Sequence, residues 1–454
     1  MDYPQTAEWL EGLANPERSG LTPRAGRKMN LDATRRLMEL LDNPHERIRA
    51  IHVAGTKGKG SVAAMLESIS RAAGYRTGLF TSPHLFSWRE RIRIDGRCIS
   101  EERVADLGTI VRPLVEQVEA EGLRRPSFFE ACTAMGMLAF AEEGLDVVVL
   151  ETGLGGRLDS TNVVTPMLSI ITTLGLDHTR ILGSTVEEIA MQKAGIIKEG
   201  VPVVVAPQPP TVEALLQRTA AGHDAPMILA EPFTVDDVQP LSPEDVAEGE
   251  VPVIAERMHG EFGAIPVDVR VPLPGLHQAV NVGVAAAAMQ VLWLTGEVPV
   301  VPEAFRSGLE RVQWPARVEL LEVLPWLVVD CAHNQESARA LMRALSRHLQ
   351  FERLILVLGA SKDKPVEALA RELDSAAVAI LTRADLPRAL PAEKIAERAG
   401  DVWPSHEVIP RPADALARAR EIAGPRDLIC VTGSVFVIGD LMEEGLLHSR
   451  MCEL

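Results

Sequence analysis

One stretch decides how this chain folds, namely Ile51-His52-Val53-Ala54-Gly55-Thr56-Lys57-Gly58-Lys59-Gly60-Ser61. Its first four residues form an apolar strand pattern, and from Ser61 to Ala73 apolar residues recur at helical spacing. A strand, a glycine-rich loop with a lysine and a helix are the layout of a phosphate-binding loop, because the N–H groups at a helix N-terminus attract anions. We therefore predict that this loop holds a polyphosphate and that Lys59 supplies the charge for its terminal phosphate.

The loop differs from the usual pattern in two ways. Gly55 and Gly58 are closer together than the glycines of the common motif, and Gly60 separates Lys59 from Ser61. A plain surface turn with a solvated lysine is the alternative, but the position between a strand and a helix disfavours it. Because the hydroxyl that normally follows the lysine is displaced, we expect the residues that hold a metal ion to lie elsewhere.

The composition is that of a folded protein with more than one domain. The chain has 454 residues, of which 46% are hydrophobic and 24% charged. Its formal net charge is −17 with 4% aromatic residues, which argues against nucleic acid and anionic membranes as partners. The five cysteines form no CxxC pair, so a zinc or disulfide framework is not supported. The sequence shows no signal-peptide pattern and no apolar run of about 18 residues, so we expect a cytoplasmic protein.

Apolar strands alternate with helices along most of the chain, which predicts an α/β fold with mostly parallel sheets. Residues 1–50 are expected to form helices around a loop, and the mixed pattern of 224–276 suggests an antiparallel segment. Residues 296–302, rich in proline and valine, are predicted to be a hinge. We therefore expect a large P-loop ATP-binding domain at 1–297 and a smaller Rossmann-like domain at 298–454.

Polar residues stand where three apolar strands end. Ser82, Glu151 and His178 follow three different strands, and ligands of open α/β sheets bind at the carboxyl ends of strands. Each residue alone is explained equally well as a solvated loop residue. Together, at the same edge as a phosphate loop, they suggest Mg²⁺, which takes few protein oxygens and bridges phosphates.

The helix that follows His178 carries a lysine on its apolar face. Thr185 and Glu188 have the spacing of a capping box, and Ile189, Lys193 and Ile197 share one face. The side chain of Lys193 could pack along its stem and reach solvent with its amine. Alternatively the amine is desolvated, which lowers its pKa and allows it to act in catalysis or to add CO₂ as a carbamate.

Three residues in the second half of the chain are candidates for nucleotide contacts. Asn281 lies at the start of a helix pattern, Arg317 precedes the second set of strands, and Asp330 ends one of them. An aspartate at a strand end can bind ribose hydroxyls, and an arginine can reach phosphates. A helix-start role for Asn281 and a surface position for Arg317 are the competing interpretations.

Taken together, these stretches resemble the folylpolyglutamate synthase/dihydrofolate synthase family of the Mur-ligase-like enzymes, over about residues 20–440. The motifs that carry the resemblance are the loop at 51–61, Thr81-Ser82-Pro83-His84-Leu85, the segment 151–162, Leu176-Asp177-His178, Gln192-Lys193-Ala194-Gly195-Ile196, Trp314-Pro315-Ala316-Arg317 and Asp330-Cys331-Ala332-His333-Asn334. The family joins L-glutamate by an amide bond to dihydropteroate, or to the terminal glutamate of a folate, with ATP.

The resemblance implies a role for each matching residue. It places the ATP phosphates on the loop Gly55–Ser61 with Lys59, and further nucleotide contacts at Asn281, Arg317 and Asp330. It places the Mg²⁺ ligands at Ser82, Glu151, His178 and a carbamylated Lys193. The glutamate site would lie near His333 and Ser434, and other substrate contacts at Ser82, Pro83, His84, Arg157 and Asp159. Lys59, Lys193 and His333 would be the catalytic residues. The implied cofactors are ATP and Mg²⁺, with K⁺ as a further candidate, and the implied partners are dihydropteroate, reduced folates and glutamate, bound by a monomer.

Residues 154–162 resemble the bacterial bifunctional type, which both makes dihydrofolate and extends folates. One departure is Ala316, where the family usually has glycine. The alternatives are a folylpolyglutamate synthase with a single activity, a Mur-type ligase acting on a cell-wall precursor, and a nucleotide-binding regulatory protein. The last would not need Glu151, His178 and Lys193 to converge on the loop.

Overall fold

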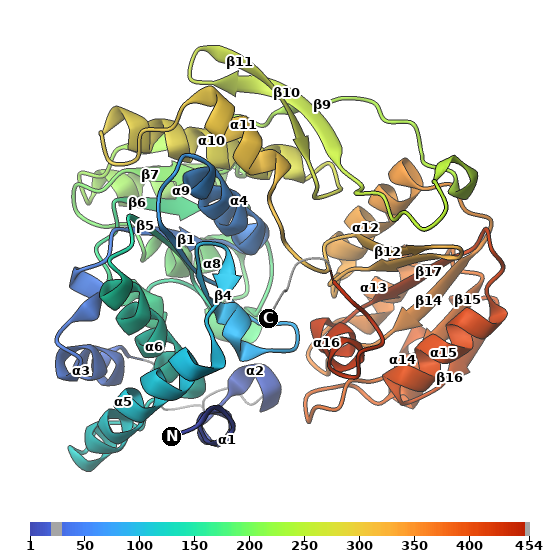
Figure 1. The fold of residues 1–454 in the computed structure, drawn as a ribbon, viewed down its shortest axis with the longest axis horizontal. Coiled ribbons are helices and arrows are strands. Elements are labelled where there is room, and N and C mark those ends of the chain that lie inside the picture. The colour runs from blue at the N-terminus through green and yellow to red at the C-terminus, as the bar shows by residue number, and fades with distance from the viewer. Residues whose placement is uncertain (20–29, 450–454) are drawn as a thin grey trace.

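The strand that precedes the glycine-rich loop lies at the centre of the larger of two sheets. In the computed structural model, which describes residues 1–19 and 30–449, this strand is β1 (Ala50–Ala54), all five residues of which are buried. The sheet has eight strands in the order β4-β3-β2-β5-β1-β6-β7-β8 (Figure 1). The other strands are β2 (Thr77–Phe80), β3 (Ile92–Ile94), β4 (Arg97–Cys98), β5 (Val147–Glu151), β6 (Leu168–Ile171), β7 (Val203–Val205) and β8 (Met227–Leu229). All neighbouring pairs from β2 to β8 are parallel, as predicted, and only β3 and β4 run antiparallel to their neighbours within the described sheet.

Helices cover both faces of this sheet, because its strands are apolar on both sides. One face is covered by α4 (Lys59–Ala72), α10 (Gln278–Leu294) and α11 (Pro302–Glu310). The other is covered by α1 (Tyr3–Glu11), α3 (Asp32–Leu40), α5 (Glu101–Ala120) and α6 (Phe128–Glu143), while α8 (Val186–Ala194) and α9 (Pro210–Ala221) pack beside β6 and β7. The loop expected within residues 1–50 includes 20–29, which lie outside the described residues. No helix of the described chain is long and apolar enough to cross a membrane.

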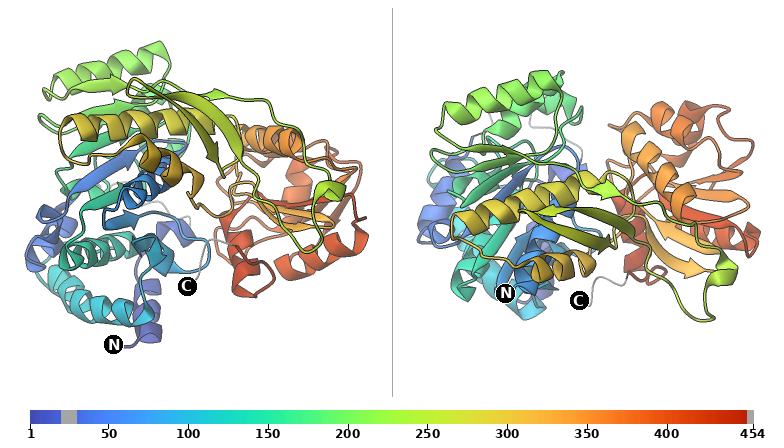
Figure 2. Two further views of the ribbon diagram at one scale, coloured as in Figure 1. Left: turned by 45° about the horizontal axis from the view of Figure 1, so that its top comes forward. Right: turned by 90° about the horizontal axis from the view of Figure 1, so that it is seen from above.

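The second sheet has six strands in the order β12-β13-β17-β14-β15-β16, parallel except for β12 against β13. Its strands are β12 (Glu319–Val323), β13 (Trp326–Val329), β14 (Leu354–Leu358), β15 (Val378–Leu381), β16 (His406–Val408) and β17 (Leu428–Thr432). Its helices are α12 (Gln335–His348), α13 (Val366–Glu372), α14 (Ala392–Ala399), α15 (Pro412–Ile422) and α16 (Val435–Glu443). This smaller α/β unit lies beside the first one (Figures 1 and 2).

The hinge predicted at residues 296–302 is wrong, because α11 belongs to the core of the first unit. Val298, Phe305 and Val312 are buried in that core. A Cβ on Gly308 would lie only 2.4 Å from Ile69 Cα, so α11 rests directly on α4. The chain therefore crosses to the second unit after Val312, and the boundary expected at residue 297 shifts accordingly.

A second connection between the units starts from the antiparallel segment. This segment is a sheet of β9 (Thr234–Val235), β10 (Glu256–Phe262) and β11 (Ile265–Val271), whereas β8, also within the predicted stretch, is a parallel edge strand of the large sheet. Residues 236–255, which join β9 to β10, cross to the second unit (Figure 2). There Leu241 exchanges backbone hydrogen bonds with His348 (2.8 Å) and Gln350 (2.9 Å).

Glu256 fastens this connection at its end. The side chain is fully buried, and its oxygens lie 2.7 Å from His348 Nε2 and 3.3 Å from Arg347 Nε. We expect Glu256→Ala to lower the free energy of unfolding by about 3 kcal/mol, since removing one partner of a buried ion pair leaves the other buried charge unpaired. Chemical denaturation would measure the loss, with Glu261→Ala on the exposed side of β10 as the control. An equal effect of the two substitutions would contradict the assignment.

Candidate active site

The glycine-rich loop presents free N–H groups at the start of α4. Gly58 caps the helix with φ +84°, a conformation that glycine adopts without strain. The N–H groups of Thr56 and Lys57 both donate to Thr173 O at 3.0 Å, which fastens the loop to the end of β6. Val62 donates to Gly58 O, so the N–H groups of residues 59–61 precede the first intrahelical bond. These N–H groups and Lys59 are the groups for which the sequence predicts an anion site.

Two distant residues pack directly on the loop. A Cβ on Gly58 would lie 2.3 Å from Asn281 Oδ1, and one on Gly60 would lie 2.5 Å from the Trp314 ring. Asn281 is buried in α10, where its amide donates to Gln278 Oε1 (2.7 Å). The structure thus brings Asn281 to the loop, and it shows why these two positions are glycine.

Glu151, Ser82 and Lys59 meet beside the loop. Glu151 ends β5, is 4% exposed, and accepts the Ser82 N–H at 3.2 Å. Its other oxygen lies 3.8 Å from Lys59 Nζ. Burial raises the pKa of Glu151, while Lys59 and the Ser82 N–H oppose the rise. A buried carboxylate with one free face, beside an anion site, is suited to a small cation.

His178 lies beyond the end of β6, the strand next to β1. It has φ 50° at the start of α7 (Thr179–Leu182), and desolvation lowers its pKa to about 4, so the imidazole is neutral at pH 7 and able to ligate a metal. The described residues hold no group of three or more His, Cys, Asp and Glu side chains that could bind a metal. A cation held by Glu151 and His178 would therefore complete its shell with Ser82, phosphate oxygens and water.

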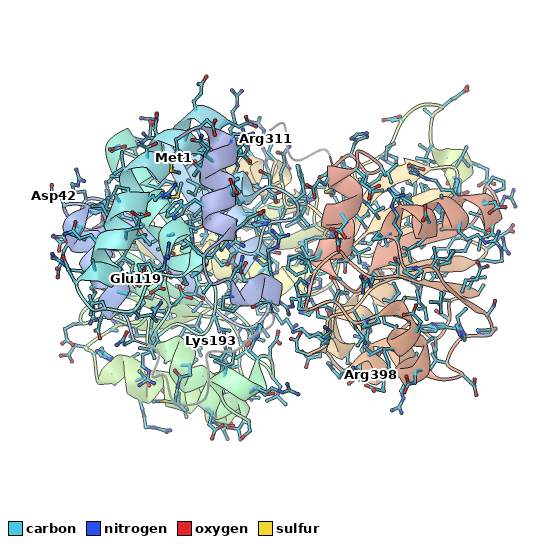
Figure 3. All side chains as sticks on the ribbon, turned by 90° about the horizontal axis from the view of Figure 1, so that it is seen from below. Met1, Asp42, Glu119, Lys193, Arg311 and Arg398 are labelled. Carbon is cyan, nitrogen blue, oxygen red and sulfur yellow. The ribbon has the colours of Figure 1, made fainter. Side chains whose placement is uncertain are left out.

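Lys193, labelled in Figure 3, is buried with its amine against the backbone of the phosphate loop. The side chain is 4% exposed, and Nζ donates to Gly55 O at 2.6 Å. Burial, with a contribution from the charge of Lys59, lowers the pKa of Lys193 to about 7. The alternative that this amine reaches solvent is thereby excluded, and a large fraction of it is neutral at neutral pH.

Asp330 and Arg317 face each other where the chain enters the second unit. Asp330 is buried, and its two oxygens accept the N–H groups of Val318 (3.0 Å) and Ala332 (2.8 Å). Burial raises the pKa of Asp330, with the Arg317 charge opposing. Asp330 thus shapes the turn that carries Arg317, in addition to the ribose contact predicted for it.

The residue before Arg317 has a backbone conformation that favours glycine. Ala316 has φ +52°, which costs a residue with a side chain roughly 1–2 kcal/mol relative to the right-handed region. We expect Ala316→Gly to raise the free energy of unfolding by up to about 1 kcal/mol. Chemical denaturation would measure the gain. Ala344→Gly, within α12, should show the opposite sign, and a loss at both positions would contradict the strain.

Asp177 connects the two units. It lies in the loop after β6, and Lys364 of the second unit donates to its Oδ1 at 2.9 Å. His333 Nε2 lies 4.0 Å from its Oδ2, while His333 Nδ1 contacts Cys331 O at 2.9 Å. Burial alone would raise the pKa of Asp177, but His333 and Lys364 lower it well below its ordinary value. Lys364 is a residue that the sequence analysis missed, although it follows the end of apolar strand β14 as the predicted residues follow theirs.

Ser434 lies at the same sheet edge as His333 and Lys364. It caps α16, and its Oγ accepts the Phe436 N–H at 3.3 Å. His333, Ser434 and Lys364 follow β13, β17 and β14, which are neighbours in the second sheet. The carboxyl edge of the second sheet therefore meets the loop after β6 through Lys364 and His333, which lie against Asp177.

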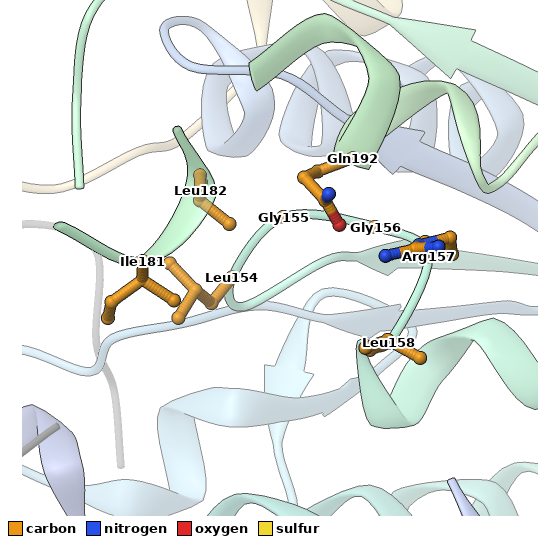
Figure 4. Close-up of a pocket in the computed structure, with 8 residues that line it drawn as sticks. All are labelled: Leu154, Gly155, Gly156, Arg157, Leu158, Ile181, Leu182 and Gln192. Carbon is orange, nitrogen blue, oxygen red and sulfur yellow. The ribbon is translucent and has the colours of Figure 1, made fainter. Parts of the chain in front are cut away.

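The loop after β5 is held in its conformation by hydrogen bonds to the carboxylate of Asp159. Asp159 accepts N–H groups from Leu154 (2.8 Å) and Thr161 (3.1 Å), together with the Thr161 hydroxyl (2.6 Å). Arg157 is exposed and lines a cavity of about 240 Å³ with Gln192 and Leu182 (Figure 4). His84 accepts a hydrogen bond from Arg91 Nε at 2.8 Å, so it is fixed beside Ser82 and Pro83.

A glycine-loop unit and a second α/β unit with polar groups at facing sheet edges define the class of Mur ligases. Residues 53–289 match the Mur ligase middle domain, and residues 316–435 match the Mur ligase glutamate ligase domain. The chain is 36% identical to the dihydrofolate synthase/folylpolyglutamate synthase of Bacillus subtilis, over 97% of this chain and 98% of the relative. The chain belongs to the dihydrofolate synthase/folylpolyglutamate synthase family, as its sequence motifs predict.

Solved structures of relatives have the same fold. The Mycobacterium tuberculosis folylpolyglutamate synthase complexed with ADP has a TM-score of 0.82 and 30% identity, covering 97% of this chain and 98% of that one. E. coli FolC in complex with DHPP and ADP has a TM-score of 0.80 and 25% identity, covering 98% and 97%. The match thus extends over both units.

Proposed function

We propose that this chain is an ATP-dependent ligase that joins L-glutamate by an amide bond to dihydropteroate and to folates. The observation that carries the proposal is the position of Lys193, whose buried amine touches the backbone of the phosphate loop. A regulatory nucleotide-binding protein has no use for a desolvated lysine at that place. The names of the relatives, which specify both dihydrofolate and folylpolyglutamate synthesis, support the bifunctional activity.

In the first step the substrate carboxylate attacks the γ-phosphorus of ATP, and ADP leaves as the acyl phosphate forms. The N–H groups at the start of α4 and Lys59 hold the phosphates and offset the negative charge that moves toward the leaving oxygen. Ser82 and Glu151, with His178, would hold Mg²⁺, which supplies further neutralisation of the phosphate charge when bound. The donor set fits Mg²⁺, since Glu151 is a buried carboxylate beside the anion site. A K⁺ site remains an expectation from the family resemblance.

Lys193 is suited to carbamylation. Its neutral amine attacks CO₂, loses a proton and becomes a carbamate, which turns a cationic side chain into an anionic one at the loop. The lowered pKa of Lys193, about 7, makes the neutral amine available. The resulting carboxylate would serve as a ligand for a second Mg²⁺.

In the second step the amine of glutamate attacks the acyl phosphate, the amide bond forms, and phosphate leaves. His333 and Ser434 would position glutamate from the second unit. The nucleotide would be held by Asn281, Arg317 and Asp330. The pterin would be held by His84, Arg157 and Asp159. Acyl phosphates react with water, so water must be excluded from the space between the two units. The contact of Lys364 with Asp177 holds the two units together over the site.

Purified protein with ATP, Mg²⁺ and glutamate tests this function. We expect release of ADP and phosphate, and a product heavier by one glutamate, with dihydropteroate and with a reduced folate. Activity with a reduced folate alone would indicate the single-activity enzyme. Phosphate release with only a muramyl substrate, or with none of these, would contradict the proposal.

Activation of the protein by CO₂ should depend on pH in the same way as the ionisation of the Lys193 amine. The ammonium form predominates below pH 7 and cannot add CO₂, so the neutral fraction rises about tenfold between pH 6 and pH 8. We expect the initial rate at which CO₂, held at a constant dissolved concentration, reactivates decarbamylated protein to rise by about the same factor. Lysine in the unfolded chain keeps its proton up to pH 10.5, so this residue should also make folding stability rise with pH between 7 and 10.5. A reactivation rate independent of pH would contradict the carbamate.

A further inference from the structure

A loop of the first unit ends in the hydrophobic core of the second. Leu85 and Phe86 follow Ser82 by three and four residues, and they pack with Val437, Ile438 and Leu441 of α16. Leu85 is 8% exposed. The same loop that carries a candidate metal ligand is therefore anchored in the opposite unit.

The loop and α16 meet backbone to backbone at Gly439. A Cβ on this glycine would lie 2.2 Å from Leu85 O and 3.1 Å from the carbonyl carbon. Ordinary contact for a Cβ begins near 3.4 Å, so any side chain at residue 439 would push the helix and the loop apart by about 1 Å. Because the obstacle is backbone rather than a flexible side chain, it cannot turn aside.

The loop is stiff enough to pass this displacement on. The buried carboxylate of Glu90 accepts the N–H groups of Leu85 (2.8 Å), Phe86 (3.1 Å) and Ser87 (2.8 Å). At its start, Ser82 donates its N–H to Glu151 in the phosphate site. The N-terminal end of α16, in turn, is Ser434.

We infer that Gly439 is a positioning residue for the reaction. By letting α16 rest on the Leu85 carbonyl, it keeps Ser82 on the phosphate side in register with Ser434 on the amine side. The acyl phosphate made on the first unit then faces the amine held by the second. This inference rests on the proposed ligase function.

Gly439→Ala tests the inference through the coupling of the two half-reactions. A shift of about 1 Å can lower the rate of a positioned reaction about 100-fold, so amide formation should fall by that order while the KM for ATP stays within about twofold. Acyl phosphate that glutamate fails to reach is hydrolysed, so phosphate released per amide formed should rise well above one. A merely destabilised enzyme would lose both products in proportion and keep a ratio of one.

Two further variants complete the design. Gly222→Ala is the matched control, since its backbone φ is −69° and its nearest neighbours to a Cβ lie at 3.5 Å. Leu85→Ala loosens the same contact from the other unit, and we expect it to raise the phosphate-to-amide ratio even if Gly439→Ala fails to fold. Since both act on one contact, the effects of Gly439→Ala and Leu85→Ala should combine less than additively.

Hydrogen exchange judges the contact without reference to activity. Peptides covering residues 84–88 should exchange faster in Gly439→Ala than in the unchanged protein or in Gly222→Ala. Unchanged exchange, or a phosphate-to-amide ratio of one in both Gly439→Ala and Leu85→Ala, would overturn the inference. If the unchanged protein makes no glutamyl amide, the proposed function fails, whereas the exchange measurement still decides whether Gly439 docks the loop.

Discussion

Replacing Lys193 with alanine is expected to lower kcat by about 1,000-fold while the protein folds normally. The amine is buried against Gly55 O, so its loss would remove the proposed carbamate ligand beside the proposed phosphate site. Neutralisation of phosphate charge by a bound metal contributes several kcal/mol to such a reaction, and each 1.36 kcal/mol is a factor of ten in rate. Folding should not suffer, because the lowered pKa of Lys193 shows that a charged amine is disfavoured at this position.

Steady-state kinetics with ATP, glutamate and either pterin substrate would measure the loss, and circular dichroism would confirm the fold. Lys198→Ala is the matched control, since this lysine lies five residues on and donates to Asn162 O (3.1 Å) rather than to the phosphate loop. Mass spectrometry of the protein without substitutions should find 44 Da added at Lys193 when bicarbonate is present, about the mass of one CO₂. Full activity of Lys193→Ala would remove the carbamate from the mechanism.

The site residues of the first unit could be predicted because they lie at the ends of apolar strands. Ser82 and Glu151 follow β2 and β5, which are neighbours in the large sheet, so their sequence positions were enough to place them together. Helical spacing placed Lys193 on the apolar face of its helix but left open whether its amine reaches solvent, which the structure excludes. Such inferences need only the periodicity of one element and the rule that parallel strands share an edge.

The contacts between the units could not be predicted from local pattern. Lys364 meets Asp177 across 187 residues of sequence, and nothing near either residue indicates the other. The placement of α11 was missed because its sequence begins with Pro302 after a proline-rich stretch, which resembles a linker. Its position depends on Gly308 fitting against Ile69, a tertiary contact that overrides the local pattern.

Glu151→Gln is expected to lower kcat by about 100- to 1,000-fold, the range measured when one charge-stabilising group is removed from an active site. Glutamine has the same size and can still accept the Ser82 N–H, so the loop after β2 keeps its anchor. The substitution removes only the negative charge that faces Lys59 and would hold the cation. Activity in the variant should also need a higher Mg²⁺ concentration, a shift that Glu199→Gln, at an exposed position, should not show.

The same substitution, Glu151→Gln, should leave the free energy of unfolding unchanged or raise it, although it lowers activity. Burial raises the pKa of Glu151 above its ordinary 4.5, so in the folded protein the carboxylate holds its proton to a higher pH than in the unfolded chain. Between those two pKa values the folded state binds more protons, and stability falls as pH rises; at pH 7 the buried charge is therefore a cost. We expect Glu151→Gln to unfold at the same or a higher denaturant concentration than the unchanged protein at pH 7. A variant that loses activity and stability together would show that Glu151 supports the fold rather than the reaction.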